Sequence, residues 1–292
     1  GFFGAGWLVE NRPDLFADVG LLLNEGGGGS ITADGRTVFG VEVTQKVPLW
    51  LRLKTRGTPG HGSRPLAETA VTRLVRALAR LDAHRFEPRA VPAVEQYLGG
   101  LAPVHPSLET DFADLDSSLR DPDFLTQLRH DYPRYNALLH NTCSLTVLEG
   151  SGKINVIPPE ARAELDCRLL PDQDPESFLE ELQRILDEPE LEIERIMGFT
   201  PAVSSTDTDL YRAIENVLRE RHPDALILPS VSTGFTDSHF FRDLGIDSYG
   251  FSPAVIPVED EGSVHGNNER IPVEELRRGV LDMLEVVERV VY

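Results

Sequence analysis

Four short polar stretches of the sequence combine chemically active side chains with glycine-rich or irregular backbone. Glu25 directly follows an apolar run, and a carboxylate in that position lies where open α/β sheets bind ligands. His61 stands between glycines and prolines, and a histidine on such a constrained loop can donate to a developing oxyanion. His265 can ligate a metal, and the turn from Thr233 to Asp237 can hold an anion through hydroxyl and backbone N–H groups.

Each of these features also has a simpler interpretation. Glu25 can be an ordinary residue at the end of a strand, His61 a turn histidine and His265 a histidine of a surface loop. The run Gly26 to Ser30 has the composition of a flexible linker. However, this run follows the apolar segment Val19 to Leu23, so we interpret it as the turn after a buried strand.

The composition excludes several classes of function. The chain has 292 residues, of which 40% are hydrophobic, so it can form one large or two ordinary domains. Its net charge of −20 argues against nucleic acid or an anionic membrane as a partner. No apolar run approaches the ~18 to 20 residues of a membrane span. Cys143 and Cys167 provide neither a disulfide framework nor a CxxC zinc motif, and we expect both to be small buried residues.

The middle of the chain has the element order of a ferredoxin-like domain. Alternating apolar residues predict strands at 47–54, 143–147, 161–169 and 191–194, and helical spacing predicts helices at 70–81 and 175–186. The resulting order β-α-β-β-α-β over about 40–199 is ferredoxin-like. Residues 85–140 show no sustained period, so we expect a long insertion with short helical pieces in this domain.

The two ends of the chain are expected to form a second domain of the α/β class. A helix is predicted at 5–15 and a strand at 19–24, and helices and strands alternate after residue 200. The last predicted helix has Leu276, Val280, Met283, Leu284 and Val287 on one face. Residues 1–39 and 200–292 would therefore form one α/β domain, with the ferredoxin-like unit inserted between its parts.

The motifs together resemble one family. NEGGG, TPGHGSRP, GSGKINVIPPEARAELDCRLLP, STGFTDSHFF and SVHGNNERIP are similar in order and spacing to motifs of the aminoacylase/carboxypeptidase S/desuccinylase family of di-zinc metallopeptidases. The resemblance extends over essentially the whole chain. The NEGGG motif and the long insertion are most similar to the carboxypeptidase S-like branch.

The resemblance implies an activity and a set of site residues. Two zinc ions would activate a bridging water for attack on the amide carbonyl of a peptide or N-acyl amino acid, which releases an amino acid. Glu25 and His265 match zinc ligands, and His61 matches the lid histidine that stabilises the oxyanion, in many members from the neighbouring subunit. Asn155 and Arg168 match residues that hold the substrate carboxylate. The resemblance also implies a homodimer formed through the ferredoxin-like lid.

The turn after residue 232 departs from the family pattern. Family members often have Gly-Gly-Thr-Asp where this chain has Gly234-Phe235-Thr236-Asp237. Phe235 would crowd a close backbone approach, so Gly234 and Thr236 either lose the anion-binding role or line a pocket with a bulkier wall.

The family's other functional residues would lie before the glycine-rich start of this chain. They are three further metal ligands and the catalytic glutamate, and His222-Pro223-Asp224, Glu180-Glu181 and Glu274-Glu275 are poor substitutes for them. We therefore expect the parent protein to be an active amidohydrolase and this chain alone to be inactive. The alternative is a non-catalytic binding or dimerisation module derived from the family. The acidic composition and the few cysteines favour a cytoplasmic protein.

Overall fold

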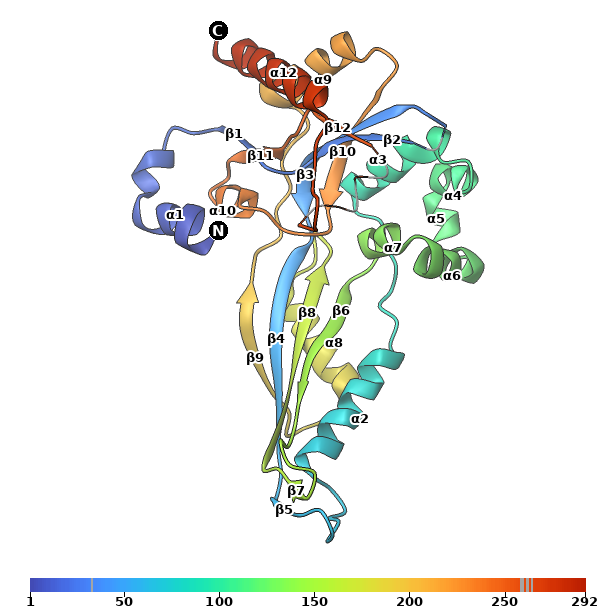
Figure 1. The fold of residues 1–292 in the computed structure, drawn as a ribbon, viewed down its shortest axis with the longest axis vertical. Helices are drawn as coiled ribbons and strands as arrows, with labels where there is room; N and C mark the ends of the chain where they lie inside the picture. Colours follow the sequence, from blue (N-terminus) through green and yellow to red (C-terminus); the bar gives the residue numbers. More distant parts are fainter. Residues whose placement is uncertain (33, 258–259, 261–262, 264) are drawn as a thin grey trace. The chain divides into compact units, whose positions relative to one another are not determined.

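The computed structural model describes residues 1–32, 34–257, 260, 263 and 265–292 (Figure 1). The chain divides into two compact units. The first unit consists of Gly1–Lys46, Arg89–Leu139 and Ala202–Tyr292, and the second of Val47–Pro88 and His140–Pro201. In the described part of the chain, no helix has the length and apolarity that a membrane span requires.

The second unit has the predicted ferredoxin-like topology. Its four-stranded antiparallel sheet has the order β6-β8-β4-β9, and Figure 1 shows α2 and α8 on the same side of this sheet. A two-stranded pair, β5 and β7, lies beyond the end of β4. The elements of this unit are β4 (Val47–Arg56), β5 (Gly60–His61), α2 (Ala70–Ala83), β6 (Thr142–Glu149), β7 (Val156–Ile157), β8 (Glu160–Leu169), α8 (Pro175–Leu186) and β9 (Glu192–Gly198).

Alternation along the strands explains how this unit folds. Leu49, Leu51 and Leu53 of β4 are fully buried against the two helices, whereas Arg52 and Lys54 lie on the other face. Both helices begin at residues that cap their free N–H groups. The hydroxyl of Thr69 accepts from the N–H of Thr72, and the carboxylate of Asp174 accepts from the N–H of Ser177.

The two cysteines are joined, which the sequence analysis did not anticipate. Cys143 of β6 and Cys167 of β8 are direct partners across the antiparallel pair and form a disulfide. Cys167 is fully buried, as expected for an inward-facing position. The disulfide was not expected, because the sequence predicted both strands but not the register that places the two cysteines opposite each other.

The first unit is built on a six-stranded mixed sheet. β1 and β11 are parallel, β3 pairs with β10 in parallel and with β2 antiparallel, and β12 lies beside β2. Its strands are β1 (Leu21–Asn24), β2 (Gly28–Ile31), β3 (Thr37–Gln45), β10 (Leu226–Ser232), β11 (Asp247–Gly250) and β12 (Val255–Ile256). Its helices are η1 (Phe2–Gly6), α1 (Trp7–Asn11), η2 (Pro13–Phe16), α3 (Pro92–Leu101), η3 (Ala102–Val104), α4 (Glu109–Ala113), α5 (Leu115–Ser118), α6 (Pro122–Asp131), α7 (Pro133–Leu139), α9 (Asp209–Arg221), α10 (Ser238–Arg242) and α12 (Val273–Val291).

The division into units differs from the predicted boundaries in two ways. The predicted boundary between residues 39 and 40 falls inside β3, which belongs entirely to the first unit. The segment 89–139 consists of short helices, as predicted, but it is also part of the first unit. A Cβ added to Gly100 of α3 would lie 2.3 Å from Leu228 of β10, so the helix packs closely on that strand. Lys46, which directly follows β3, also donates to the carbonyl of Ala137.

The ends of the chain depart from the predicted helices. The helix predicted at 5–15 is broken at Pro13 into a π-helical turn, a short α-helix and a 3₁₀ turn. The last helix, α12, packs through Gly279, Asp282 and Val286. Its predicted apolar face is largely exposed: Leu276 is 53% exposed and Val280 60%.

Candidate functional site

Glu25 lies at the end of β1, where the following glycines turn the chain. Its side chain is exposed, and Gly26 and Gly27 have φ angles of 119° and 62°, which favour glycine. A Cβ on Gly26 would lie 2.4 Å from the Glu42 carboxylate, and one on Gly27 2.4 Å from the carbonyl oxygen of Gly250. The glycine run is therefore a tight turn into β2 and not a linker.

Glu42 is a buried acid beside Glu25 that the sequence analysis missed. It lies in the middle of β3, is 1% exposed and forms an ion pair with Arg242 at 3.6 Å. Burial raises the pKa of Glu42 to about 7, and the negative charge of Glu25 adds to the rise, whereas Arg242 and the Thr236 hydroxyl oppose it. The available signal was a carboxylate between the valines of Val41-Glu42-Val43.

The Thr236 turn is fastened to the end of β3. The backbone N–H and the hydroxyl of Thr236 both donate to the side-chain oxygen of Gln45, at 2.9 and 3.2 Å. Gly234 donates its N–H to the Ser232 hydroxyl, and a Cβ at Gly234 would have ordinary contacts. The structure therefore brings Thr236 close to Glu42, but it gives no steric reason for glycine at position 234.

His265 lies on an exposed loop in the left-handed conformation. Its φ is 61°, and its N–H donates to the Glu269 carboxylate at 3.2 Å. Val264, in the same predicted motif, lies outside the described residues. Glu25 and His265 have the donor types that zinc accepts, but the described residues contain no group of three or more His, Cys, Asp or Glu side chains that could hold a metal. These residues alone therefore do not fit a catalytic zinc ion.

His61 and Asn155 meet at the tip of the second unit. β5 and β7 pair His61 with Val156, and the N–H of Gly62 donates to the carbonyl of Asn155 at 2.8 Å. The Nδ1 atom of His61 accepts from the backbone N–H of Ser63 at 3.2 Å, and the Ser63 hydroxyl is 2.8 Å from it. Because a backbone N–H can only donate, we assign the neutral tautomer in which Nε2 carries the proton and can donate outwards.

Arg168 lies far from this tip in the same unit. Its side chain is on the polar face of β8, as predicted, and Nε and Nη2 donate to the Asp166 carboxylate at 2.6 and 3.0 Å. The register pairs Arg168 with Pro48 and Glu160 with Arg56, so Arg168 is at the opposite end of the sheet from β5. Eight residues of strand correspond to about 26 Å.

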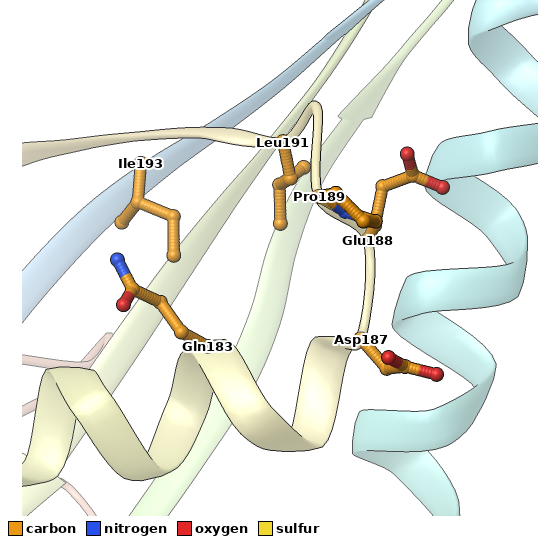
Figure 2. Close-up of a pocket in the computed structure, with 6 residues that line it drawn as sticks. All are labelled: Gln183, Asp187, Glu188, Pro189, Leu191 and Ile193. Atoms are coloured by element: carbon orange, nitrogen blue, oxygen red, sulfur yellow. The ribbon is translucent and has the colours of Figure 1, made fainter.

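A separate hollow of about 380 Å³ lies in the second unit between the end of α8 and the start of β9 (Figure 2). Figure 2 shows Leu191 and Ile193 on its strand side, with the Gln183 amide directed towards Ile193. The other lining groups include the carboxylates of Asp187 and Glu188. None of the predicted site residues lines this hollow, and we assign it no function.

Comparison with known proteins gives the context for these sites. A model described as "Peptidase dimerisation domain" (M20_dimer) matches residues 43–194, just over half of the chain. The chain is 29% identical to the N-fatty-acyl-amino acid synthase/hydrolase PM20D1 of Xenopus tropicalis, over 99% of this chain and 57% of the relative. It is 24% identical to the probable carboxypeptidase S-like 2 of Dictyostelium discoideum, over 83% of this chain and 47% of the relative. The chain therefore spans about half the length of these relatives.

A solved structure has the same fold. The M20 family metallo-carboxypeptidase Sso-CP2 of Sulfolobus solfataricus superposes with a TM-score of 0.66 at 20% identity, over 97% of this chain and 66% of that structure. These matches agree with the motifs and with the ferredoxin-like topology of the second unit. The chain belongs to the M20 family of metallopeptidases and has a carboxypeptidase S-like relationship within this hydrolytic family.

Proposed function

We propose that the whole protein hydrolyses the amide bond of an N-acyl amino acid or a peptide and releases an amino acid. The tip formed by His61 and Asn155 carries the proposal, because the contacts of Ser63 leave the Nε2–H of His61 free to donate to an oxyanion. The names of the Xenopus and Dictyostelium relatives support amide hydrolysis as the reaction class.

The other predicted residues have specific roles in this proposal. Arg168 and the Asn155 of a second copy bind the substrate carboxylate, for which Arg168 must exchange its bond to Asp166. Gly234 and Thr236 line the site. Glu25 and His265 are ligands of zinc in the whole protein, although the described residues do not complete a metal site. Zinc would supply Lewis-acid polarisation of the scissile carbonyl.

The proposed assembly is a homodimer. Arg168 lies at one end of the four-stranded sheet, and His61 lies beyond its other end in the β5–β7 pair. The two are about 26 Å or more apart along the strands, so one small substrate cannot touch both within this unit. A site that uses both residues requires the tip of a second copy. The description of the matched model as a dimerisation domain supports this arrangement.

The test is a hydrolysis assay of the whole protein with N-acetyl amino acids and dipeptides, with and without a metal chelator. We expect chelator-sensitive hydrolysis, and we expect His61→Ala to lower kcat about 10²- to 10³-fold with little change in KM. His130→Ala, at an exposed histidine of α6, is the control. No hydrolysis of any of these substrates, together with intact dimerisation, would instead support the non-catalytic module.

A further inference from the structure

The last helix, α12, carries an exposed apolar stripe along its whole length. The stripe residues follow one another at intervals of three or four positions, so they share one face of the helix. This outer stripe consists of six exposed residues: Val273, Leu276, Val280, Leu284, Val287 and Val291. Single exposed apolar residues are normal on a protein surface, whereas a continuous row of them marks an interaction surface.

Polar contacts hold the opposite face of α12 against the first unit. Asp282 is 0% exposed, and its carboxylate lies 3.6 Å from Nε2 of His222 and 3.9 Å from Nε of Arg221, at the C-terminal end of α9. Figure 1 shows α12 beside α9. The Glu275 carboxylate accepts from the N–H of Val255 at 3.0 Å. A rotation of α12 that buried the outer stripe would break these contacts, so the outward direction of the stripe is fixed by the fold.

The helix therefore reverses the usual arrangement of an amphipathic helix. A surface helix normally buries its apolar stripe and exposes its charged residues. The residues that α12 buries are Gly279, Asp282 and Val286, while its valines and leucines of the outer stripe stay exposed. Because burial of apolar surface is the main favourable term in folding and association, α12 gains stability when a partner covers the stripe.

Strand β1 of the same unit also has the composition of an element with further neighbours. β1 ends the sheet, and its free edge has no partner strand among the described residues. Leu21, Leu22 and Leu23 form an uninterrupted apolar run, which is typical of a strand that is covered on both faces inside a parallel sheet. All three are only half-buried. The sequence of β1 therefore fits an inner strand of a larger sheet.

The lengths of the matched proteins indicate what covers these surfaces. The chain corresponds to 57% of the Xenopus relative and to 66% of the Sulfolobus structure, so a large part of each has no counterpart in these 292 residues. A further part of the same polypeptide is held nearby at a high effective concentration, and it can cover apolar surface without a second molecule having to be immobilised.

The charges beside the outer stripe give less support to a second copy as the partner. When identical helices pair, charges on the flanks of the apolar seam commonly set the choice of partner. The arginines on α12 are already paired within the first unit: Arg277 with Glu274, and Arg289 with Glu220. The surface thus offers apolar area, which is the character of a permanent interface.

We infer that the outer stripe of α12 and the free edge of β1 are an intramolecular interface of the whole protein. The partner is the part of the protein outside these 292 residues, which contributes a further strand beside β1 and an apolar surface against α12. The inference rests on exposed surface and strand order, and it does not depend on the catalytic activity proposed above.

The first test measures the exposure of α12 directly. Photochemical carbene labelling, which modifies exposed side chains, is applied to the full chain and to the whole protein at several concentrations. We expect Val280 and Leu284 to be labelled about fivefold less in the whole protein, because their exposed fractions of 60% and 52% should fall to the roughly 10% or less of buried side chains. This protection should be the same at every concentration.

Two results of the labelling would overturn the inference. Equal labelling of the outer stripe in the whole protein and in the full chain would mean that the rest of the polypeptide does not cover it. Protection in the whole protein that appears only as its concentration rises would mean that a second copy is the partner.

Matched substitutions give an independent test. Leu284→Gln and Leu244→Gln each place an amide at an exposed leucine of the first unit, but only Leu284 belongs to the outer stripe. In the full chain, both should change the midpoint of thermal unfolding by less than about 2 °C. In the whole protein, Leu284→Gln should lower it by about 4 °C or more, because the amide would be buried without a partner. Equal shifts for the two variants in the whole protein would contradict the inference.

Discussion

The two units differ in what they bury. The second unit buries aliphatic side chains such as Leu51 and Leu165 and carries its charges on the outer face of the sheet. The first unit buries Glu42, Arg242 and Asp282 and exposes much of the apolar face of α12. Each buried charge has a desolvation cost of several kcal/mol, so burial of charge is a feature to explain and burial of leucine is not.

The two units also differ in how their candidate site residues relate to the core. In the second unit, the alternation of apolar and polar residues predicts the four strands of the main sheet, and the candidate site residues lie on the loops and the polar face. In the first unit, the candidate metal ligand Glu25, the turn of Thr236 and a cavity of about 400 Å³ all converge on the buried pair Glu42–Arg242. The contrast can be tested by making the same substitution at a buried residue and at an exposed residue of the same type.

The largest effect is expected from removing a buried cation. Arg242→Met should destabilise the first unit by about 3 to 5 kcal/mol, because it leaves Glu42 uncompensated and removes one of the two donors to the carbonyl of Ser248. Arg52→Met is the matched control at a partly exposed arginine that bridges Glu164 and Glu194, and it should cost much less because solvent screens these ion pairs. The measurement is urea-induced unfolding, and equal losses would contradict the contrast.

A similar effect is expected from a cavity in the apolar core. Leu165→Ala should destabilise the second unit by about 2 to 5 kcal/mol, because Leu165 is 1% exposed. Its cross-strand partner Leu145 is 46% exposed, so Leu145→Ala should cost less than about 0.5 kcal/mol. Fluorescence of Trp50, which lies in β4, reports on this unit in a Trp7→Phe background. A large loss in Leu145→Ala would mean that the face of β6 is covered in solution.

A pH effect of about 3 kcal/mol is expected from Glu42. Its pKa in the folded state, about 7, is above the ordinary value of 4.5, so the folded protein binds this proton more tightly than the unfolded chain does. The corresponding stability is fully present below pH 4.5 and is lost as the pH rises towards 7. Glu42→Gln should remove this decline when unfolding is measured without added metal at pH 4.5 and 7.5.

The control for Glu42→Gln is the same substitution at Glu109, an exposed residue of α4. If both variants retain the decline between the two pH values, the group that causes it is not Glu42.

The smallest effect is expected at the tip. Ser63→Ala removes a hydroxyl 2.8 Å from Nδ1 of His61 and leaves the backbone donor in place. The loss of one hydrogen bond, about 1 kcal/mol, should shift the tautomer ratio of His61 by up to about tenfold. Long-range ¹H–¹⁵N correlation spectra of the imidazole measure this ratio. Ser63→Thr should behave as the unsubstituted chain, and an unchanged spectrum in Ser63→Ala would rule out the hydroxyl contact.

The sequence predicted the second unit well because its signals are local. The helix predicted at 175–186 has the observed bounds, and the strand predicted at 161–169 is extended by one residue. The strand β3 was missed because it is buried along most of its length and therefore shows no alternation. The predicted domain boundary fell within β3 for the same reason.

Prediction of the site was limited by contacts between distant residues. The motifs identified His61 and Asn155 separately, but only the pairing of β5 with β7 brings them together. The contact of Arg168 with Asp166 is an exception, because the two residues are two positions apart on the same face of β8. Arg134 and Tyr97 lay in a segment without periodicity, and the packing of that segment on the first unit is what makes them lining residues of the cavity beside Glu42.

The disulfide between β6 and β8 has a consequence for association. β6 is an edge strand, and edge strands are the places where other chains add to a sheet. A slip of β6 by one residue would turn all its side chains to the opposite face, and the Cys143–Cys167 bond excludes this slip. The disulfide therefore fixes which side chains of β6 lie on each face of the sheet. As long as the disulfide is intact, a second chain that pairs with this edge always contacts the same arrangement of side chains.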